Sequence, residues 1–275
     1  NNSGVIEAQS IVNKNGVIVL DGGPSGAVTN SGTLDASGKV TGQTGGTVKV
    51  LGDNITLAAG TNIDVSGYSS GGTALVGGNS LGQGPEQNAA TATVANGATI
   101  NADAITACNG GKVVVWSDDI TSFDGTISAK GGTSSGDGGF VETSGKKLKI
   151  GDNALITTTA TNGKTGTWLL DPDGFTIAAI GGDITGARLG SQLDSSNVMI
   201  LSTSGSGYDG SINVNDTVNW SADTTLTLNA TNKINVNAPI TGSGASSGLA
   251  LSALLDININ SPSSLQVNTL TANAT

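Results

Sequence analysis

Carboxylates that could perform acid–base chemistry occur at two places in the chain. Asp118 and Asp119 are adjacent, and a pair of carboxylates is what glycoside-cleaving sites use. Adjacent residues of a strand point to opposite faces, however, so these two side chains do not easily reach one bond. The run Asp171-Pro-Asp-Gly174 offers oxygen ligands for calcium, but it lacks the repeated nonapeptide of calcium-binding solenoids. We expect both to form turns, with catalysis and calcium binding as the alternatives.

Two other groups could bind a ligand without catalysing a reaction. Lys146, Lys147 and Lys149 form a basic cluster that could contact a glycan sulfate or a lipid, although a solvated corner explains it more simply. For Cys108, the single cysteine, we expect a partly buried thiol in preference to a haem ligand or an intermolecular bridge. Neither feature defines a site by itself.

Features that could stack against sugars or carry them are also present. Trp116, Trp168 and Trp220 could be stacking platforms, but each stands among alternating apolar residues, which favours packing in a core or at a corner. Six Asn-x-Ser/Thr sequons begin at Asn1, Asn54, Asn215, Asn219, Asn229 and Asn273. A chain this rich in asparagine, serine and threonine contains about that many by chance. The sequons therefore leave glycosylation undecided.

The composition removes most enzyme chemistries. The 275 residues include no histidine, which excludes a histidine-dependent triad, an imidazole base and histidine-ligated zinc or haem. One cysteine excludes an intrachain disulfide framework and a thiolate cluster. The net charge of -10 argues against nucleic acid, because affinity for phosphate backbones depends on Lys and Arg. We expect a protein that is no enzyme and that holds no cofactor and no metal.

The hydrophobic residues are enough for a narrow core and no more. Valine, isoleucine and leucine are present in the amount that a thin stack of strands can bury, and the low charge content disfavours a solvated coil. Apolar runs are short throughout, so no membrane span is expected. The first residues lack the basic and apolar regions of a signal peptide, which indicates a processed or internal piece of a longer chain.

One phrase recurs through the earlier part of the chain. It reads Gly-Thr-Leu-Asp-Ala-Ser-Gly at 32–38 and returns in modified form at 60–67, 97–102 and 125–131. The first and last intervals between its leading glycines are equal, and the middle interval is longer. A double glycine and a short β-branched run follow each copy, beginning at Gly45, Gly71, Gly110 and Gly138. Two independent markers thus recur together, which is the signature of a repeat architecture.

The later part of the chain repeats with a shorter step. Asn-rich tetrapeptides that alternate apolar and polar residues begin at Ile212, Ile234 and Ile257, at nearly equal intervals. Such alternation is typical of a strand with one buried face. A step of roughly 22 to 28 residues that holds two or three short strands fits one coil of a parallel β-helix.

We therefore expect an all-β chain folded as one continuous parallel β-helix, or solenoid, of about eleven coils with one extruded loop and one short helix. Coils of about 28 residues would span 1–182, a short helical insertion 183–197, and coils of about 22 residues 198–275. Both ends, residues 1–10 and 265–275, should be exposed because neither has an amphipathic cap. The inward-facing residues would include Val48, Val50, Val113, Val115, Ile234, Val236, Ile257 and Ile259.

Two segments interrupt the repeat. Residues 77–91 are polar and aperiodic and contain a proline, which predicts a loop outside the coil. Since this loop adds nothing to the core ladder, we expect its deletion to leave the melting temperature nearly unchanged. Residues 184–194 predict a helix beside the coils, with Thr185 as its N-cap. Its apolar face would consist of Ile184, Leu189 and Leu193.

The segment from Gly110 to Pro172 carries several motifs in a fixed order. Gly-Gly-Lys-Val-Val-Val-Trp-Ser-Asp comes first, then Gly-Thr-Ile-Ser-Ala-Lys-Gly-Gly, Gly-Gly-Phe-Val-Glu-Thr-Ser-Gly-Lys and Gly-Thr-Trp-Leu-Leu-Asp-Pro. This ordered set resembles the filamentous-haemagglutinin-like large exoproteins of two-partner secretion systems, which include adhesins and haem-utilisation proteins. The resemblance implies a right-handed β-helical shaft. It also implies export through an outer-membrane transporter, by way of a secretion domain that this sequence lacks.

The same resemblance implies a secreted protein of the bacterial cell surface. A rigid, monomeric adhesin segment would present loops to a host cell-surface protein or glycan. Haem or haemopexin acquisition and toxin delivery are alternatives within the family, and a β-helical polysaccharide-active enzyme is disfavoured because no carboxylate cluster with aromatic platforms is evident. The extruded loop is the segment most free to bind a partner, although a spacer without a partner is the alternative. Its candidate residues are Asn79, Ser80, Gln83, Glu86, Gln87 and Asn88.

Overall fold

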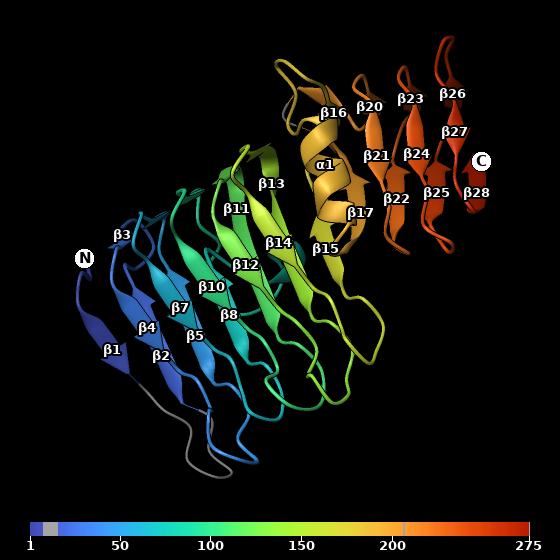
Figure 1. Cartoon of the computed structure of the whole chain (residues 1–275). Helices are drawn as coiled ribbons and strands as arrows, with labels where there is room; N and C mark the ends of the chain where they lie inside the picture. Colours follow the sequence, from blue (N-terminus) through green and yellow to red (C-terminus); the bar gives the residue numbers. More distant parts are fainter. Residues whose placement is uncertain (8–15, 206, 275) are drawn as a thin grey trace.

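The computed structural model describes residues 1–7, 16–205 and 207–274. The chain is nearly all β, and successive passes of it, here called coils, stack along one axis (Figure 1). Strands of neighbouring coils pair in parallel. Among the described residues, the only antiparallel pair is the hairpin of β18 (Ser204–Gly205) and β19 (Tyr208–Asp209). The long parallel sheets agree with the expected solenoid.

The longest sheet runs almost the full length of the stack. In spatial order it contains β2 (Val17–Asp21), β5 (Thr47–Leu51), β8 (Thr73–Val76), β11 (Lys112–Phe123), β13 (Phe140–Ile150), β15 (Thr167–Leu170), β17 (Asn197–Ser202), β22 (Thr225–Ala230), β25 (Gly248–Ala253) and β28 (Thr269–Ala274). Identical positions of the sequence repeats lie in register. Val113 of β11, for example, stands between Ala74 and Val141 of the neighbouring coils.

Shorter strands form the other sides of the coils. One set comprises β3 (Ala27–Asn30), β6 (Asn54–Leu57) and β9 (Thr91–Val94). Of these strands, β9 pairs with the second half of β11. A six-stranded sheet holds β1 (Val5–Glu7), β4 (Thr33–Asp35), β7 (Asn62–Asp64), β10 (Thr99–Asn101), β12 (Thr126–Ser128) and β14 (Leu155–Thr157). The later coils add β16 (Phe175–Ile177), β20 (Ile212–Val214), β23 (Ile234–Val236) and β26 (Ile257–Ile259), and also β21 (Val218–Trp220), β24 (Ile240–Gly242) and β27 (Leu265–Gln266).

The core is a continuous ladder of inward-facing aliphatic side chains. Of the eight residues expected to face inward, the six in β5, β11 and β23 are fully buried. Ile257 is only half-buried and Ile259 is 45% exposed. They lie in β26, the edge strand of its sheet, which has a neighbour on one side only. Ile257 still packs against the core as expected, whereas the expectation is wrong for Ile259.

Both ends of the stack are exposed, as expected, but each end is a strand that pairs with one neighbouring coil. Val5 of β1 is 65% exposed, and every residue of β28 is exposed although β28 pairs with β25 along its whole length. Residues 8–10 and 275 lie outside the described residues. The two outer coils therefore present unpaired strand edges.

The predicted helix forms, but it lies within the stack and not beside it. In α1 (Gly186–Leu193), the Thr185 hydroxyl accepts a hydrogen bond from the Arg188 backbone N–H at 3.2 Å, which caps the first turn. The Gln192 side chain accepts from the Ile156 N–H of β14 at 2.7 Å, and α1 packs against β21 on its other side (Figure 1). The helix thus takes the place of a strand in one coil. Of the expected apolar face, Leu189 and Leu193 are buried within α1, and Ile184 is buried just before the helix, where it forms a bridge with Ile177.

No helix in the described ranges has the length and apolar character needed to cross a membrane.

Candidate functional site

The adjacent carboxylates Asp118 and Asp119 lie in a strand and not in a turn. They form a bulge in the middle of β11, because two residues of β11 stand opposite one residue of β13 between Ser117 and Ile120. The bulge separates the half of β11 that pairs with β8 from the half that pairs with β9. Asp118 also has a structural role, since its Oδ1 accepts hydrogen bonds from Trp116 Nε1 and Asn88 Nδ2, both at 3.0 Å.

The tryptophans pack as the sequence predicted. Trp168 is fully buried and its Nε1 donates to Thr143 Oγ1 at 2.9 Å, while Trp220 is buried in β21. Trp116 is half-buried on the outer side of β11, where Gly82 lies directly against its indole ring. All three side chains therefore serve packing.

The basic cluster and the cysteine are both exposed. Lys146, Lys147 and Lys149 are exposed on β13, and Lys149 Nζ donates to the Gly182 carbonyl. Cys108 is an exposed free thiol, which corrects the expectation of partial burial. It lies in a connection between coils and has a positive φ of 60°, which is uncommon for residues other than glycine.

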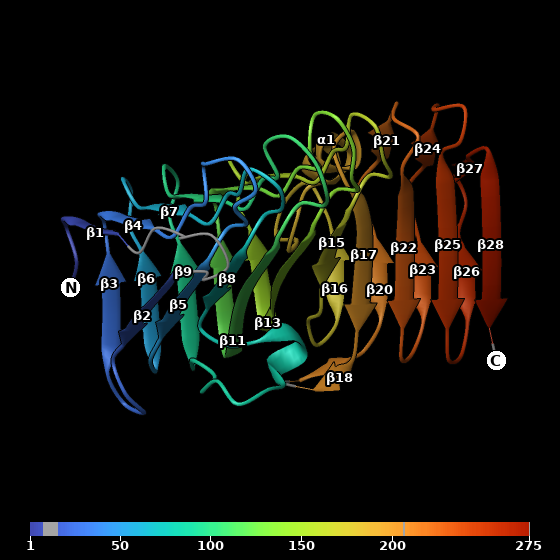
Figure 2. The ribbon, with the colours of Figure 1, turned by 90° about the horizontal axis from the view of Figure 1, so that it is seen from below.

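The extruded loop forms as predicted, and its residues 77–90 are called the insertion loop below. It contains the short helix η1 (Ser80–Gly82), and β9 begins at Thr91. The insertion loop folds back against the outer side of β11 and does not project freely (Figure 2). Val114 and Glu142 alternate with core residues and so point outward, yet both are fully buried. The insertion loop is therefore an outer layer of the long sheet.

Four of the six predicted loop residues are engaged within the molecule. The buried Glu142 carboxylate accepts hydrogen bonds from the Ser80 hydroxyl and the Leu81 N–H. Asn79 and Glu86 bind each other and nearby lysines, and Asn88 donates to Gly82 O as well as to Asp118. Gln83 is exposed and Gln87 half-buried. The premise that this loop contributes nothing to the packed structure is therefore wrong, and we expect deletion of residues 79–88 to lower the melting temperature.

Three carboxylates gather at the edge of the insertion loop. Burial, together with repulsion from the neighbouring Glu142 and Asp173, raises the pKa of Asp171 to about 6. The Asp171 backbone N–H donates to Ser144 Oγ at 3.1 Å. Because Glu142 is fully buried beneath the insertion loop, a large substrate cannot reach the three carboxylates together. Among the described residues, no group of three or more His, Cys, Asp or Glu side chains is arranged to hold a metal ion.

A second surface was not anticipated from the sequence. Five connections from the six-stranded sheet back to the long sheet protrude side by side along the lower edge of Figure 1. We call this surface the loop corner, and it consists of residues 36–46, 65–72, 102–111, 129–139 and 158–166. Each connection is closed at its base by a backbone hydrogen bond, such as Gly72 N–H to Val65 O at 2.7 Å and Gly111 N–H to Ala102 O at 2.7 Å.

The double glycines of the repeat are needed at the base of the loop corner. A Cβ on Gly138 would lie 1.7 Å from the Thr158 carbonyl oxygen, and one on Gly71 would lie 1.9 Å from that of Ala102. Only glycine permits this approach of one backbone to another. The stacked glycines also line an open groove of about 520 Å³ that Lys112 and Phe140 border.

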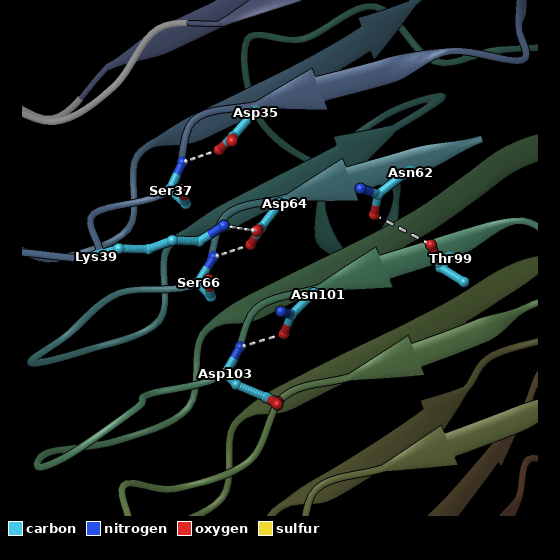
Figure 3. Close-up of polar contacts among 9 residues, drawn as sticks. All are labelled: Asp35, Ser37, Lys39, Asn62, Asp64, Ser66, Thr99, Asn101 and Asp103. Carbon is cyan, nitrogen blue, oxygen red and sulfur yellow. Dashed lines mark hydrogen bonds and ion pairs between the residues drawn. The ribbon is translucent and has the colours of Figure 1, made fainter. Parts of the chain in front are cut away.

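The repeated phrase builds the other wall of the loop corner. Asp35 Oδ1 accepts from Ser37 N–H at 2.8 Å, and the equivalent bonds in the next coils join Asp64 to Ser66 and Asn101 to Asp103 (Figure 3). These are Asx-turns, which end the strand and start the protruding connection. The phrase itself, with Asp or Asn two residues before a polar residue, was a signal that could have revealed them.

The turns open onto a polar groove of about 400 Å³. Lys39 Nζ pairs with Asp64 Oδ2 at 2.8 Å (Figure 3), and Asp103 Oδ1 accepts from Ser128 Oγ at 2.6 Å. Burial opposes ionisation of Asp64, but hydrogen bonds from Lys39 and Ser66 outweigh it and lower the pKa of the carboxyl. The other polar lining residues are Asn101, Lys130, Thr133, Thr159 and Thr161.

The polar groove is suited to hydrogen bonding with a polar ligand. Hydroxyl, amide, carboxylate and ammonium groups recur from coil to coil, at a spacing of about 4.8 Å. Comparison with known proteins adds nothing to this geometry: no family model matches the chain, and no curated protein matches its sequence. Function is therefore inferred from the loop corner and the stack that supports it.

Proposed function

We propose that this chain is a binding segment of a rigid surface shaft, an adhesin that engages a host cell-surface protein or glycan without catalysis. The shaft would be a right-handed parallel β-helix of the filamentous-haemagglutinin-like kind that the motifs between Gly110 and Pro172 resemble. It would be secreted through an outer-membrane transporter and displayed at the bacterial cell surface.

The observation that carries this proposal is the loop corner. Five polar connections stand in a row over a core that is fully packed, so partners can reach only faces and corners of the stack. A row of equivalent groups offers several weak contacts to one extended ligand, and such contacts add up through effective concentration. The insertion loop is the weaker candidate because most of its polar side chains already have partners.

The test compares two sets of substitutions in the purified chain. Lys130→Ala, Thr159→Ala and Thr161→Ala together remove side chains from the polar groove without touching the core. The control set, Lys233→Ala, Thr227→Ala and Thr271→Ala, removes the same residue types from the later coils. Attachment to host cells and binding on a glycan array should fall about tenfold for the first set only, as expected for loss of about 1.4 kcal/mol of binding free energy.

Two results would contradict the proposal. Equal attachment by the two sets would remove the loop corner from consideration. Turnover of pectin, chondroitin or another polyuronide by the intact chain would show an enzyme instead of a binding segment.

A further inference from the structure

Lys112 of β11 contacts Asn79 of the insertion loop, and Asn79 contacts Glu86 of the same loop. Lys112 Nζ donates a hydrogen bond to Asn79 Oδ1 at 3.1 Å, and Asn79 Nδ2 donates to Glu86 Oε2 at 2.8 Å. The other oxygen of this carboxylate, Glu86 Oε1, pairs with Lys49 Nζ at 2.8 Å. An amine therefore lies against one end of a carboxamide, while a carboxylate holds the nitrogen at its other end.

The surroundings keep this arrangement in place. Asn79 caps η1, and its Oδ1 also accepts from the Ser80 N–H at 2.8 Å. The Glu86 side chain is only 7% exposed. Gly84 closes over both residues, since a Cβ there would lie 3.0 Å from Asn79 Nδ2 and 3.1 Å from Glu86 Oε2. Hydrogen bonds at Oδ1 and Nδ2, together with the close approach of Gly84, therefore fix the orientation of the Asn79 carboxamide.

We propose that Lys112 and Asn79 form an intramolecular isopeptide bond. In this step Lys112 Nζ loses its proton and attacks Asn79 Cγ, and a new C–N bond forms. The bond from Cγ to Nδ2 then breaks, and Nδ2 leaves as ammonia, which takes up the proton to become ammonium. One amide is exchanged for another, so the step needs no oxidant, no reductant and no further reactant.

Glu86 is placed to orient the leaving nitrogen. Hydrogen bonds from Lys49 and Asn79 lower the pKa of Glu86, so the carboxylate is ionised and holds Nδ2 on the side of the carboxamide away from Lys112. It already contacts Nδ2, the atom that must be protonated before it can leave. Holding amine and carboxamide together supplies the high effective concentration that an unactivated amide requires. Departure of ammonium into solvent makes the exchange irreversible.

The bond would join the insertion loop covalently to β11. A chain with one cysteine has no disulfide with which to do this. A cross-link between residues 79 and 112 would fix the cover over Val114 and Glu142 and restrict the unfolded chain. This consequence is independent of what the loop corner binds.

The test is the intact mass of the whole chain under denaturing conditions. We expect a mass lower than that of the sequence by one ammonia, and a branched peptide that joins residues 79 and 112 after proteolysis. Lys112→Arg keeps the charge but removes the nucleophile, so it should have the full sequence mass. Lys130→Arg, at the loop corner, should lose ammonia as the parent chain does. Glu86→Gln should slow the loss at least tenfold.

Succinimide formation also releases ammonia and must be distinguished. It is expected at the exposed Asn-Gly pairs that begin at Asn96, Asn109 and Asn162, and also at Asn15-Gly16, whose asparagine lies outside the described residues. A succinimide opens in mild base and regains mass as water, whereas an isopeptide bond survives this treatment. The proposal is overturned if the parent chain keeps its full mass after long incubation, if the loss is reversed by base, or if Lys112→Arg loses ammonia equally.

Discussion

The coils before α1 and the coils after it share one core and differ in their outer surfaces. Both halves stack inward-facing aliphatic residues in register, such as Val113 on Val141 and Ile212 on Ile234. Before α1, the connections protrude as the loop corner over stacked glycines. Beyond β17 the steps shorten, and partners in the strands from β20 to β28 are 21 to 25 residues apart, compared with 28 between Val113 and Val141.

Asparagine side chains form ladders along the later coils, in the way that the double glycines stack along the earlier coils. Asn235 Nδ2 donates to Asn213 Oδ1 at 2.9 Å, and Asn258 Nδ2 donates to Asn235 Oδ1 at 2.9 Å. A second ladder joins Asn215, Asn237 and Asn260. Side-chain amide ladders thus join adjacent coils after α1 in addition to backbone pairing, whereas before α1 stacked glycines allow one backbone to approach the next closely. Glycine leaves the connection free to vary in length, which is what a binding surface requires.

The largest expected effect comes from adding one methyl group at the base of the loop corner. Gly138→Ala places Cβ 1.7 Å from a backbone oxygen of the adjacent connection and 2.5 Å from Gly166 N, and neither atom can move alone. We expect a loss of about 3 kcal/mol or more in the free energy of unfolding. The control from the later coils is Gly248→Ala, where the Cβ meets the Thr225 side chain at 2.6 Å.

A threonine side chain can rotate, so Gly248→Ala should cost about 1 kcal/mol or less. Denaturant unfolding with hydrogen exchange is the suitable measurement, because stacked coils can unfold locally. Equal losses in the two variants would mean that close backbone packing is no more important before α1 than after it.

Deletion of residues 79–88 should have the next largest effect. It removes both hydrogen-bond donors of the buried Glu142 carboxylate and uncovers Val114. Without the loop, Val114 and the Glu142 carboxylate face water, so the lost apolar burial and the two lost hydrogen bonds together cost roughly 3 kcal/mol. We therefore expect a melting temperature lower by several degrees. The matched control, Gln83→Ala with Gln87→Ala, leaves these bonds intact and should melt as the parent chain does.

The sequence predicts the repeated parts of this molecule well because they are local. The β-branched run in Lys112–Val115 predicts the strand, and Thr185 with the apolar spacing that follows it predicts the helix. Positions that depend on distant partners are not predictable in this way. Glu142 stands in an ordinary strand, and its contact with Ser80 is 62 residues away along the chain. Whether α1 lies beside the coils or within them depends on β21, which comes after it.

The loop corner is an intermediate case. Its turns are visible in the repeated phrase, because Asp64 and Ser66 stand at the spacing of an Asx-turn. The groove is not visible, since Lys39 and Lys130 reach it from different coils. The bulge at Asp118 is hidden for the same reason, because it exists only relative to β13.

Two aspartates, one on each side of α1, should respond to pH in opposite ways. Burial and the nearby Glu142 raise the pKa of Asp171 to about 6, so its ionisation destabilises the fold. That penalty is absent below pH 3.8, grows as the pH rises, and is complete above about pH 6. Asp171→Asn should therefore stabilise the chain at pH 7.5 and change little at pH 4. Since solvent reaches the carboxyl and screens the repulsion, we expect about 1–2 kcal/mol.

Asp209 provides the opposite sign. Hydrogen bonds from Ser211 lower the pKa of Asp209, so its ionised form stabilises the fold above the ordinary pKa and this contribution is lost in acid. Asp209→Asn should therefore destabilise the chain slightly at pH 7.5. Melting temperatures of both variants between about pH 2 and pH 8 check the signs, because the Asp209 contribution is lost only below pH 3.8. Parallel pH profiles for the two variants would contradict these assignments.

The smallest effect tests the asparagine ladder itself. Asn235→Ala removes one bond to Asn213 and one to Asn258. Because these amides are half-buried and water competes for them, we expect a loss of about 1 kcal/mol. Exchange of the backbone amides in β20, β23 and β26 should speed up, while that in β11 and β13 should not. Asn219→Ala, an exposed asparagine of β21 outside both ladders, is the control. If it costs as much as Asn235→Ala, the ladder adds no stability, and the aliphatic core alone holds the later coils together.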